Sequence, residues 1–275
     1  MPTDASTLEG IVLSDAEFHQ FQEFFQDRIG LHLADHKKQL LVGRFGKRLR
    51  ELGLRSFRAY FERLRNGSDP GELETAVGLI TTHETHFFRE SHHFDLLQGT
   101  ICGAKAPGED LRVWSAACST GEEPWTIAMC LHQRLGPGGW ELVASDVSND
   151  VIAQAAAGLY PMERASEIPP HYLKAYCLKG KDRFLGKLLI DRTLRDRVEF
   201  RQLNLLEIPP EMTGFDVVFL RNVIIYFDAP TKFHVLTEVA RRIRPGGWLL
   251  LGHSESLTGM DLPLNQVKPS VFRRI

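Results

Sequence analysis

Residues 112–126 read Arg-Val-Trp-Ser-Ala-Ala-Cys-Ser-Thr-Gly-Glu-Glu-Pro-Trp-Thr, and Asp146 follows about twenty residues later. The apolar pair Val113-Trp114 is typical of a strand that enters a turn of small residues, after which an amphipathic helix pattern begins. A second apolar run, 142–144, ends just before Asp146. Small residues let the backbone approach a ligand, and the acid can accept hydrogen bonds from both ribose hydroxyls. The stretch therefore predicts a β-turn-α-β unit that binds a nucleoside.

The glycine content of the first turn narrows the choice of nucleoside. By itself the unit would fit a nicotinamide enzyme nearly as well, and a lone Asp146 could equally be a turn or helix-capping residue. Gly121 is the only glycine in the turn, so the Gly-x-Gly-x-x-Gly fingerprint of pyrophosphate sites is missing. The turn therefore favours a cofactor without a pyrophosphate.

Composition bounds the class of protein. The chain has 275 residues, 43% hydrophobic and 25% charged, with a formal net charge of −2, which indicates a soluble globular protein. The acidic first twenty residues do not resemble a signal peptide, and no apolar run is long enough to insert into a membrane. The cysteines are widely spaced, without a Cys-x-x-Cys pair, so we expect reduced thiols and a cytoplasmic protein.

Periodicity predicts two kinds of architecture along the chain. Apolar residues recur at helical spacing over 14–77, whereas strands alternate with helices from Leu111 onward, the pattern of a parallel sheet. We expect an all-α N-terminal domain at 1–79, a linker at 80–98 that contributes to the cofactor site, and a doubly wound, Rossmann-like α/β domain at 99–275. The expected strands lie near 111–115, 141–146, 198–203, 215–220 and 247–252.

The N-terminal helices carry a basic block. Between Gly30 and Arg65 the sequence has ten Lys or Arg against three Asp or Glu. Such a block can steer an acidic partner, although a solvated helix face explains it equally well. No aromatic-rich basic strand or recognised binding motif accompanies the charge, so we do not expect nucleic acid as a partner. The block includes Lys37, Lys38, Arg44, Lys47, Arg48 and Arg50.

Six motifs follow one another in a fixed order along the chain. They are Thr-Thr-x-x-Thr-x-Phe-Phe-Arg-Glu (81–90), Ser-Thr-Gly-Glu-Glu-Pro (119–124), Ala-Ser-Asp (144–146), Asn-Leu-Leu (204–206), Arg-Asn-Val-x-Ile-Tyr-Phe (221–227) and Pro-Gly-Gly-x-Leu-x-Leu-Gly-x-Ser-Glu (245–255). In this order they resemble the chemotaxis receptor methyltransferases, the CheR family, over nearly the whole chain. The resemblance implies a methyltransferase domain with S-adenosylmethionine as methyl donor and S-adenosylhomocysteine as product. It also implies receptor glutamates as acceptors, which become methyl esters.

The first two motifs give one wall of the implied cofactor site. By resemblance, Thr85 and Arg89 lie in that site, together with His83, which stands where many family members have asparagine. Either Glu122 or Glu123 contacts the methionine or ribose end of the donor. Alternatively, the two acids form an ordinary acidic first turn of a helix, which complements the helix dipole.

The later motifs give the other wall. The resemblance assigns Asp146 to the ribose, and Asn204 and Leu205 to the adenine. It places Arg221 and Asn222 along the pocket. These positions follow predicted strands, at the edge where open α/β sheets bind their ligands.

The reacting end is assigned to Arg89 and Tyr226. A glutamate carboxylate is ionised at neutral pH, so the reaction requires no general base. We expect the planar guanidinium of Arg89 to fix a carboxylate, and the hydroxyl of Tyr226, near the transferred methyl, to position the attacking oxygen. Tyr226 could also be an ordinary core aromatic residue.

A metal site is not expected. His83, His86, His92 and His93 are clustered in sequence, but their spacing is not that of a His-Glu-x-x-His zinc site. We expect the adjacent His92 and His93 side chains to point apart on a helix.

Residues 165–200 interrupt the alternation of strands and helices. The resembling family carries a small antiparallel β subdomain here, which in some members binds the receptor's C-terminal peptide by strand addition. We expect a monomer that binds cytoplasmic helices of chemoreceptors. The alternatives are a methyltransferase of this fold with another protein or small molecule as acceptor, or a non-catalytic regulator that binds the donor.

Overall fold

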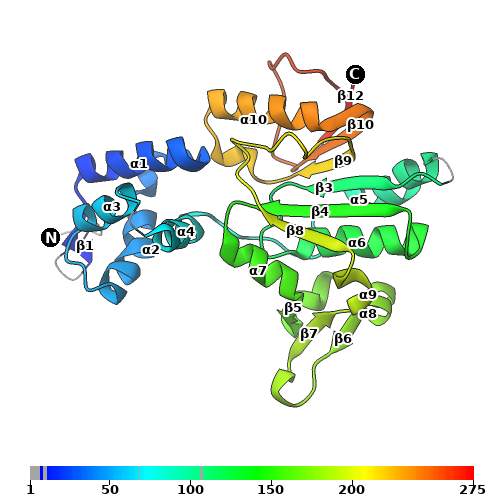
Figure 1. Cartoon of the computed structure of the whole chain (residues 1–275), viewed down its shortest axis with the longest axis horizontal. Helices are drawn as coiled ribbons and strands as arrows, with labels where there is room; N and C mark the ends of the chain where they lie inside the picture. The colour runs from blue at the N-terminus through cyan, green and yellow to red at the C-terminus, as the bar shows by residue number, and fades with distance from the viewer. Residues whose placement is uncertain (1–6, 9–10, 68, 106–107) are drawn as a thin grey trace. The chain divides into compact units, whose positions relative to one another are not determined.

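The computed structural model describes residues 7–8, 11–67, 69–105 and 108–275, and the chain divides into two compact units (Figure 1). The helical unit comprises the described residues up to Thr82 together with Tyr226–Thr231. The α/β unit comprises His83–Ile225 and Lys232–Ile275.

The helical unit begins and ends its first helix with strong local signals. Ser14 and Glu17 form a capping box, in which each side chain satisfies a free backbone N–H, and Gly30 closes the helix with φ of 72°. The apolar positions of the helices meet in an aromatic core, where Phe21 and Phe45 lie 5.6 Å apart between ring centroids. The elements of this unit are the short pair β1 (Thr7–Leu8) and β2 (Ile11–Val12), then α1 (Asp15–Ile29), η1 (Asp35–Lys37), α2 (Lys38–Glu51), α3 (Phe57–Arg65) and α4 (Pro70–Ile80).

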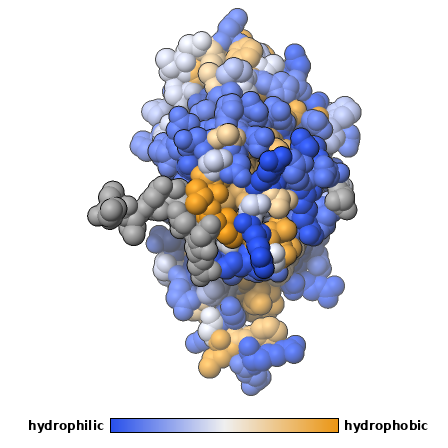
Figure 2. Space-filling model, turned by 90° about the vertical axis from the view of Figure 1, so that its left-hand side faces the viewer, coloured by the Kyte–Doolittle hydropathy of each residue, from blue (hydrophilic) through white to orange (hydrophobic). Residues whose placement is uncertain are grey.

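Basic residues of α2 hold this unit together. Arg48 binds the buried carboxylate of Glu72 through two hydrogen bonds of 2.7 and 3.1 Å, and the hydroxyl of Tyr60 donates a third at 2.7 Å. Arg44 donates to the carbonyls of 79, 80 and 81 at the end of α4. These two residues of the basic block are therefore structural. The face of the molecule drawn in Figure 2 is mainly hydrophilic, with small hydrophobic patches.

In the described residues of the α/β unit, seven strands form one sheet in the order β11-β12-β10-β9-β3-β4-β8. The run from β10 to β8 is parallel, and β12 and β11 are antiparallel at one end. Every residue of β9 is buried, as expected for a parallel strand covered on both faces. The strands are β3 (Leu111–Ser115), β4 (Trp140–Asp146), β8 (Val198–Gln202), β9 (Phe215–Leu220), β10 (Ile243–Leu251), β11 (Leu264–Lys268) and β12 (Val271–Arg274).

Alternate residues of the strands enter different cores. Val113, Val217 and Phe219 belong to the same apolar cluster as side chains from α5 and α6. Their neighbours Trp114 and Val218 are also fully buried, and successive strand residues point to opposite faces. The sheet is therefore covered on both sides. The helices of this unit are α5 (His92–Leu96), η2 (Leu97–Ile101), η3 (Cys102–Ala104), α6 (Glu122–Leu135), α7 (Asn149–Ala157), η6 (Ile224–Tyr226) and α10 (Ala229–Arg242). The last residue of η6 and the first residues of α10 belong to the helical unit.

A small antiparallel sheet of order β5-β7-β6 is inserted between α7 and β8. The sequence predicts this insert at 165–200, but its first strand lies earlier, and 198–200 belong to β8 of the large sheet. A three-residue strand carries too little alternation to be read from sequence, and β5 is of that length. The insert consists of β5 (Leu159–Pro161), η4 (Met162–Glu167), α8 (Pro170–Tyr176), β6 (Cys177–Lys179), η5 (Asp182–Phe184), β7 (Lys187–Ile190) and α9 (Arg192–Arg195).

The predicted fold class is confirmed: an all-α N-terminal part precedes a doubly wound α/β unit with a small antiparallel β insert. None of the helices in the described part of the chain combines the length and the apolar character that crossing a bilayer requires.

Replacing Arg48 by Met should destabilise the helical unit, because it leaves the Glu72 carboxylate, whose side chain is 1% exposed, without its cation. We expect the free energy of unfolding to fall by about 2 kcal/mol in urea titrations followed by circular dichroism. The matched control is Lys47→Met, since Lys47 makes only an exposed pair with Glu51 at 3.9 Å. Equal losses in both variants would contradict the structural role of Arg48.

Candidate functional site

The candidate site is built where the parallel strands end. The segments that follow β3, β4, β8 and β9 leave the same edge of the sheet, because parallel strands point their carboxyl ends one way. Asp146 is the last residue of β4, and its side chain accepts the N–H of Ser119 at 2.9 Å and that of Ser148 at 3.1 Å. Burial raises the pKa of Asp146, and the backbone hydrogen bonds and the nearby His83 oppose that rise. Asp146 thereby fixes the first turn against the end of β4.

The first turn is too tightly packed for a side chain at its glycine. Gly121 has φ of 98°, and a Cβ there would lie 2.7 Å from both the Cβ of Ala155 and the hydroxyl oxygen of Tyr160. Only glycine satisfies both the backbone angle and the close approach.

The two acids that begin α6 have different environments. Glu122 is fully buried, where it accepts hydrogen bonds from Thr120 at 2.6 Å and from Arg164 at 2.7 Å. Glu123 accepts from Ser115 at 2.7 Å and from Arg221, and 12% of its side chain is exposed. Of the pair, Glu123 is therefore the one that a ligand can reach.

Arg221 joins three parts of the site. Its side chain is 1% exposed, and it pairs with Glu123 at 2.8 Å and with Glu90 at 3.2 Å. It also donates to the carbonyl of Arg89 and lies over the ring of Phe94. Burial would raise the pKa of Glu90, but the Arg221 charge and hydrogen bonds from 253 and 222 bring it below its usual value. The linker, α6 and the end of β9 are thus held by one guanidinium.

A cavity of about 570 Å³ lies beside this ion-pair network. Arg89 lines it, and one of its guanidinium nitrogens donates to the carbonyl of Glu84 at 2.9 Å. Asn222 lines it too, in a left-handed conformation with φ of 58°, and its backbone N–H donates to the buried Glu255 at 2.9 Å. The cavity offers cationic, amide and imidazole groups, which suit a carboxylate-bearing ligand. Its lining residues are His86, Arg89, Glu90, His92, Asn222, His253 and Ser254.

The remaining expected cofactor residues lie on the same unit. The carbonyl of His83 accepts the hydroxyl of Ser119 at 3.3 Å, and the carbonyl of Thr85 accepts from Arg164 at 3.0 Å. After β8, the Asn204 side chain caps its own turn by accepting the N–H of 206 at 3.1 Å, and Leu205 is buried. The linker and the strand ends are thus brought together.

Tyr226 falls in the other unit. Its carbonyl accepts the N–H of His32 at 2.8 Å, and it groups with the helical unit rather than with the α/β unit that holds Arg89. The structure therefore assigns the two expected reacting-end residues to different units.

The histidines of α5 do not point apart as we expected. The rings of His92 and His93, the first two residues of α5, lie 4.1 Å apart between centroids. Ligand atoms of Glu90, His92 and His93 come within 4.8 Å of one another. However, Glu90 is already neutralised by Arg221. Burial and the Arg221 charge lower the pKa of His93 to about 3, so this ring is neutral and hydrogen-bonds Ser270 at 2.9 Å.

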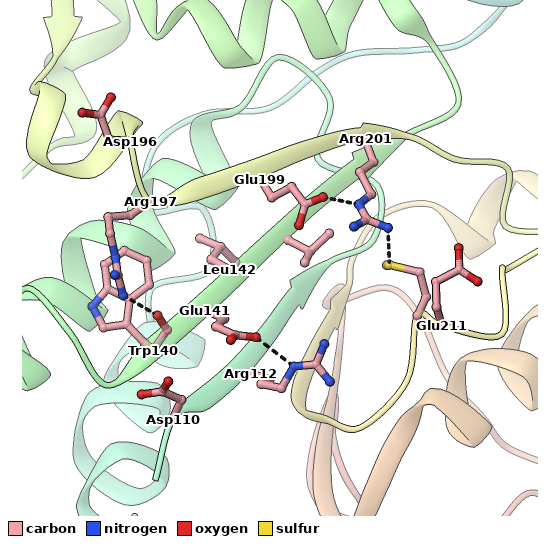
Figure 3. A pocket seen from close by; sticks show the side chains of 12 residues that line it. Asp110, Arg112, Trp140, Glu141, Leu142, Asp196, Arg197, Glu199, Arg201 and Glu211 are labelled. Carbon is pink, nitrogen blue, oxygen red and sulfur yellow. Dashed lines mark hydrogen bonds and ion pairs between the residues drawn. The ribbon is translucent and has the colours of Figure 1, made fainter. Parts of the chain in front are cut away.

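A second cavity, of about 500 Å³, lies toward the opposite ends of the strands (Figure 3). Its charged side chains bind one another: Arg112 pairs with Glu141 at 3.0 Å, and Arg201 pairs with Glu199. Arg197 donates to the carbonyl of Trp140 and lies over its ring. Because these cations are already neutralised or stacked, the cavity is a weaker candidate for a ligand site.

Comparison with protein families gives two matches. The description "CheR methyltransferase, SAM binding domain" matches residues 83–272, and "CheR methyltransferase, all-alpha domain" matches residues 16–81. Together they span both units.

Curated relatives agree over most of the chain. A chemotaxis protein methyltransferase of Escherichia coli K12 is 39% identical over 256 residues, which are 92% of this chain and 88% of the relative. Chemotaxis protein methyltransferase 2 of Pseudomonas aeruginosa is 40% identical over 271 residues, 95% and 96% of the two chains. Among solved structures, the N-methyltransferase NodS of Bradyrhizobium japonicum with S-adenosyl-L-homocysteine matches with a TM-score of 0.36 and 14% identity, covering 61% of this chain and 63% of that one, which is too low to add to the argument.

Replacing Glu90 by Gln should lower the stability of the protein in a pH-dependent way. A carboxyl whose pKa is depressed in the folded state contributes stability above its unfolded pKa of about 4.3, and that contribution is lost as pH falls through the folded value. We therefore expect the wild type to be more stable than the variant at pH 7, with the difference narrowing below about pH 4. Chemical denaturation at several pH values measures it. The exposed Glu163→Gln is the control, and a difference that stays constant with pH would contradict the ion pair.

Proposed function

Because the chain belongs to the CheR methyltransferase family, we propose that this S-adenosylmethionine-dependent methyltransferase is a protein-glutamate O-methyltransferase of chemotaxis. Its acceptors would be glutamate side chains on the cytoplasmic helices of chemoreceptors, which become methyl esters. The observation that supports a carboxylate acceptor is the cavity that Arg89 lines beside the carboxyl edge of the sheet.

The residues at this edge fit the donor. The buried carboxylate of Asp146 retains acceptor capacity for ribose hydroxyls beyond its two backbone hydrogen bonds, since a carboxylate accepts about four. Asn204 and Leu205 would contact the adenine, with Leu205 as an apolar wall. Thr85, His83 and the reachable Glu123 would hold the methionine end. The donor, when bound, supplies a methyl group that its sulfonium already activates.

The protein itself would have to orient the two reactants and exclude water from them. The acceptor carboxylate is ionised at neutral pH, so the site needs no general base. Holding reactants in line is worth up to about 7–11 kcal/mol in well-oriented systems. Arg89 would fix a carboxylate, of the donor or of the acceptor, through its planar fork. Arg221 and Asn222 would shape the pocket from the end of β9.

The receptor would contact the helical unit through its exposed basic residues. Arg44 and Arg48 are committed to α4 and Glu72, and Lys38 pairs with Asp15 at 2.8 Å. The block residues left for an acidic receptor surface are therefore Lys37, Lys47 and Arg50, which are exposed. Attraction between exposed charges weakens with salt, and this contact would weaken in the same way.

The β insert offers a second contact. Its edge strands β5 and β6 present backbone groups to which a receptor's C-terminal peptide would add as a further strand. Leu178 and Leu185 are exposed on this insert and would meet the peptide's apolar side chains.

We propose that the protein acts as a cytoplasmic monomer.

Replacing Arg89 by Ala should lower methyl transfer to receptor cytoplasmic domains at least about tenfold, since a hydrogen bond to a charged group is worth about 1.5–3 kcal/mol. The assay incubates the protein with labelled donor and receptor domains and measures volatile methanol released by alkali. Arg241→Ala is the matched control, because Arg241 makes an exposed pair with Glu238.

Full turnover by the Arg89→Ala variant would remove this residue from the reacting site. Alkali-labile esters on another protein, and none on receptor domains, would replace the proposed acceptor. Donor binding without methyl transfer to any acceptor would identify a regulator instead of an enzyme.

A further inference from the structure

The base of the β insert touches both loops that form the donor site. Tyr160, the middle residue of β5, donates its hydroxyl to the carbonyl of Thr120 at 2.7 Å. Its ring packs edge-on against Phe87 of the linker, with centroids 5.1 Å apart. Burial, and the charge of Glu122, raise the pKa of Tyr160 well above its usual value, so the hydroxyl stays a donor. One side chain of the insert thus contacts the first turn and the linker together.

Arg164 makes a second bridge of the same kind. It follows β5 in η4, and one of its guanidinium nitrogens donates to Glu122 at 2.7 Å and to the carbonyl of Thr85 at 3.0 Å. The other carboxylate oxygen of Glu122 accepts from Thr120 at 2.6 Å. A buried carboxylate without a cation is strongly disfavoured, so Glu122 depends on Arg164 for its place at the start of α6.

The insert and the first turn are closely packed against each other. A Cβ at Gly121 would lie 2.7 Å from the Tyr160 hydroxyl oxygen, which means that the turn backbone lies directly against the tyrosine. Close-packed groups of this kind transmit a displacement instead of absorbing it. Movement of β5 would therefore move the turn that Asp146 also holds.

We propose that Arg164 and Tyr160 are positioning residues of the methyl-donor site. The β insert holds the linker at Thr85 and the first turn at Thr120 and Glu122 in the conformation that receives the donor, in addition to any peptide it binds. A pre-ordered site binds more tightly, because the ligand does not have to order the loops. The proposal rests on the donor site described above and not on the identity of the acceptor.

Isothermal titration of the full chain with S-adenosylhomocysteine tests it. We expect Arg164→Met to raise the dissociation constant about tenfold, with a less favourable binding entropy, and Tyr160→Phe to raise it about threefold. Arg164→Lys, which keeps the charge but not the fork, should lie between Arg164→Met and the wild type. A double variant tests whether Arg164 acts through Glu122. If it does, Arg164→Met combined with Glu122→Gln should raise the dissociation constant by less than the product of the two single-variant factors, so that the two effects on binding free energy are less than additive.

The matched control is Arg192→Met, since Arg192 lies on the same insert and pairs with Asp196 where both side chains are exposed. We expect no change in its dissociation constant. Thermal unfolding of each variant without ligand separates positioning from folding. Lower melting temperatures with unchanged dissociation constants would overturn the proposal, and if Arg164→Met does not fold, Arg164→Lys and Tyr160→Phe decide by the same criterion. Because the titration needs no acceptor, its result is independent of the receptor assay.

Discussion

The ion pairs of Arg221 are the interaction on which the site depends. One buried guanidinium forms ion pairs with both Glu90 on the linker and Glu123 on α6, and it also donates to the linker carbonyl of Arg89. Removing one partner from a buried charge network leaves the other charges uncompensated, at a cost of several kcal/mol. The linker has no regular secondary structure before α5, so this network supplies the order that a helix or strand would otherwise give it.

The elements of the fold follow from local signals that sequence displays. The capping box at Ser14, the glycine at 30 and the mostly apolar run of β9 can each be recognised from neighbouring residues in the chain. The insert was harder to place because β5 pairs with β7 across a long connection and is too short to show alternation. The expected range therefore begins after β5, although the broken pattern marked the interruption and the family resemblance implied a β insert there.

The strand ends that meet at the candidate site were predictable from the sequence, but the contacts of their residues were not. Motifs at strand ends meet at one edge of a parallel sheet, so Asp146, Asn204 and Arg221 could be placed there from order alone. The bonds Arg164–Glu122 and Arg221–Glu123 join residues 42 and 98 positions apart, and such contacts leave no periodic trace in a single sequence. For the same reason the basic block did not reveal that Arg48 is committed to Glu72.

The charges at the α/β edge and those of the basic block differ in burial and pairing. Those of Glu122, Glu123 and Arg221 at the α/β edge are paired and largely buried, which fixes their geometry. Those of Lys37, Lys47 and Arg50 are exposed, where they act at a distance and are screened by salt. A carboxylate acceptor needs placement more than it needs a titrating base, since it is already ionised. Paired arginines and glutamates keep their charge across neutral pH, and a site made of them can therefore hold its shape without taking part in proton transfer.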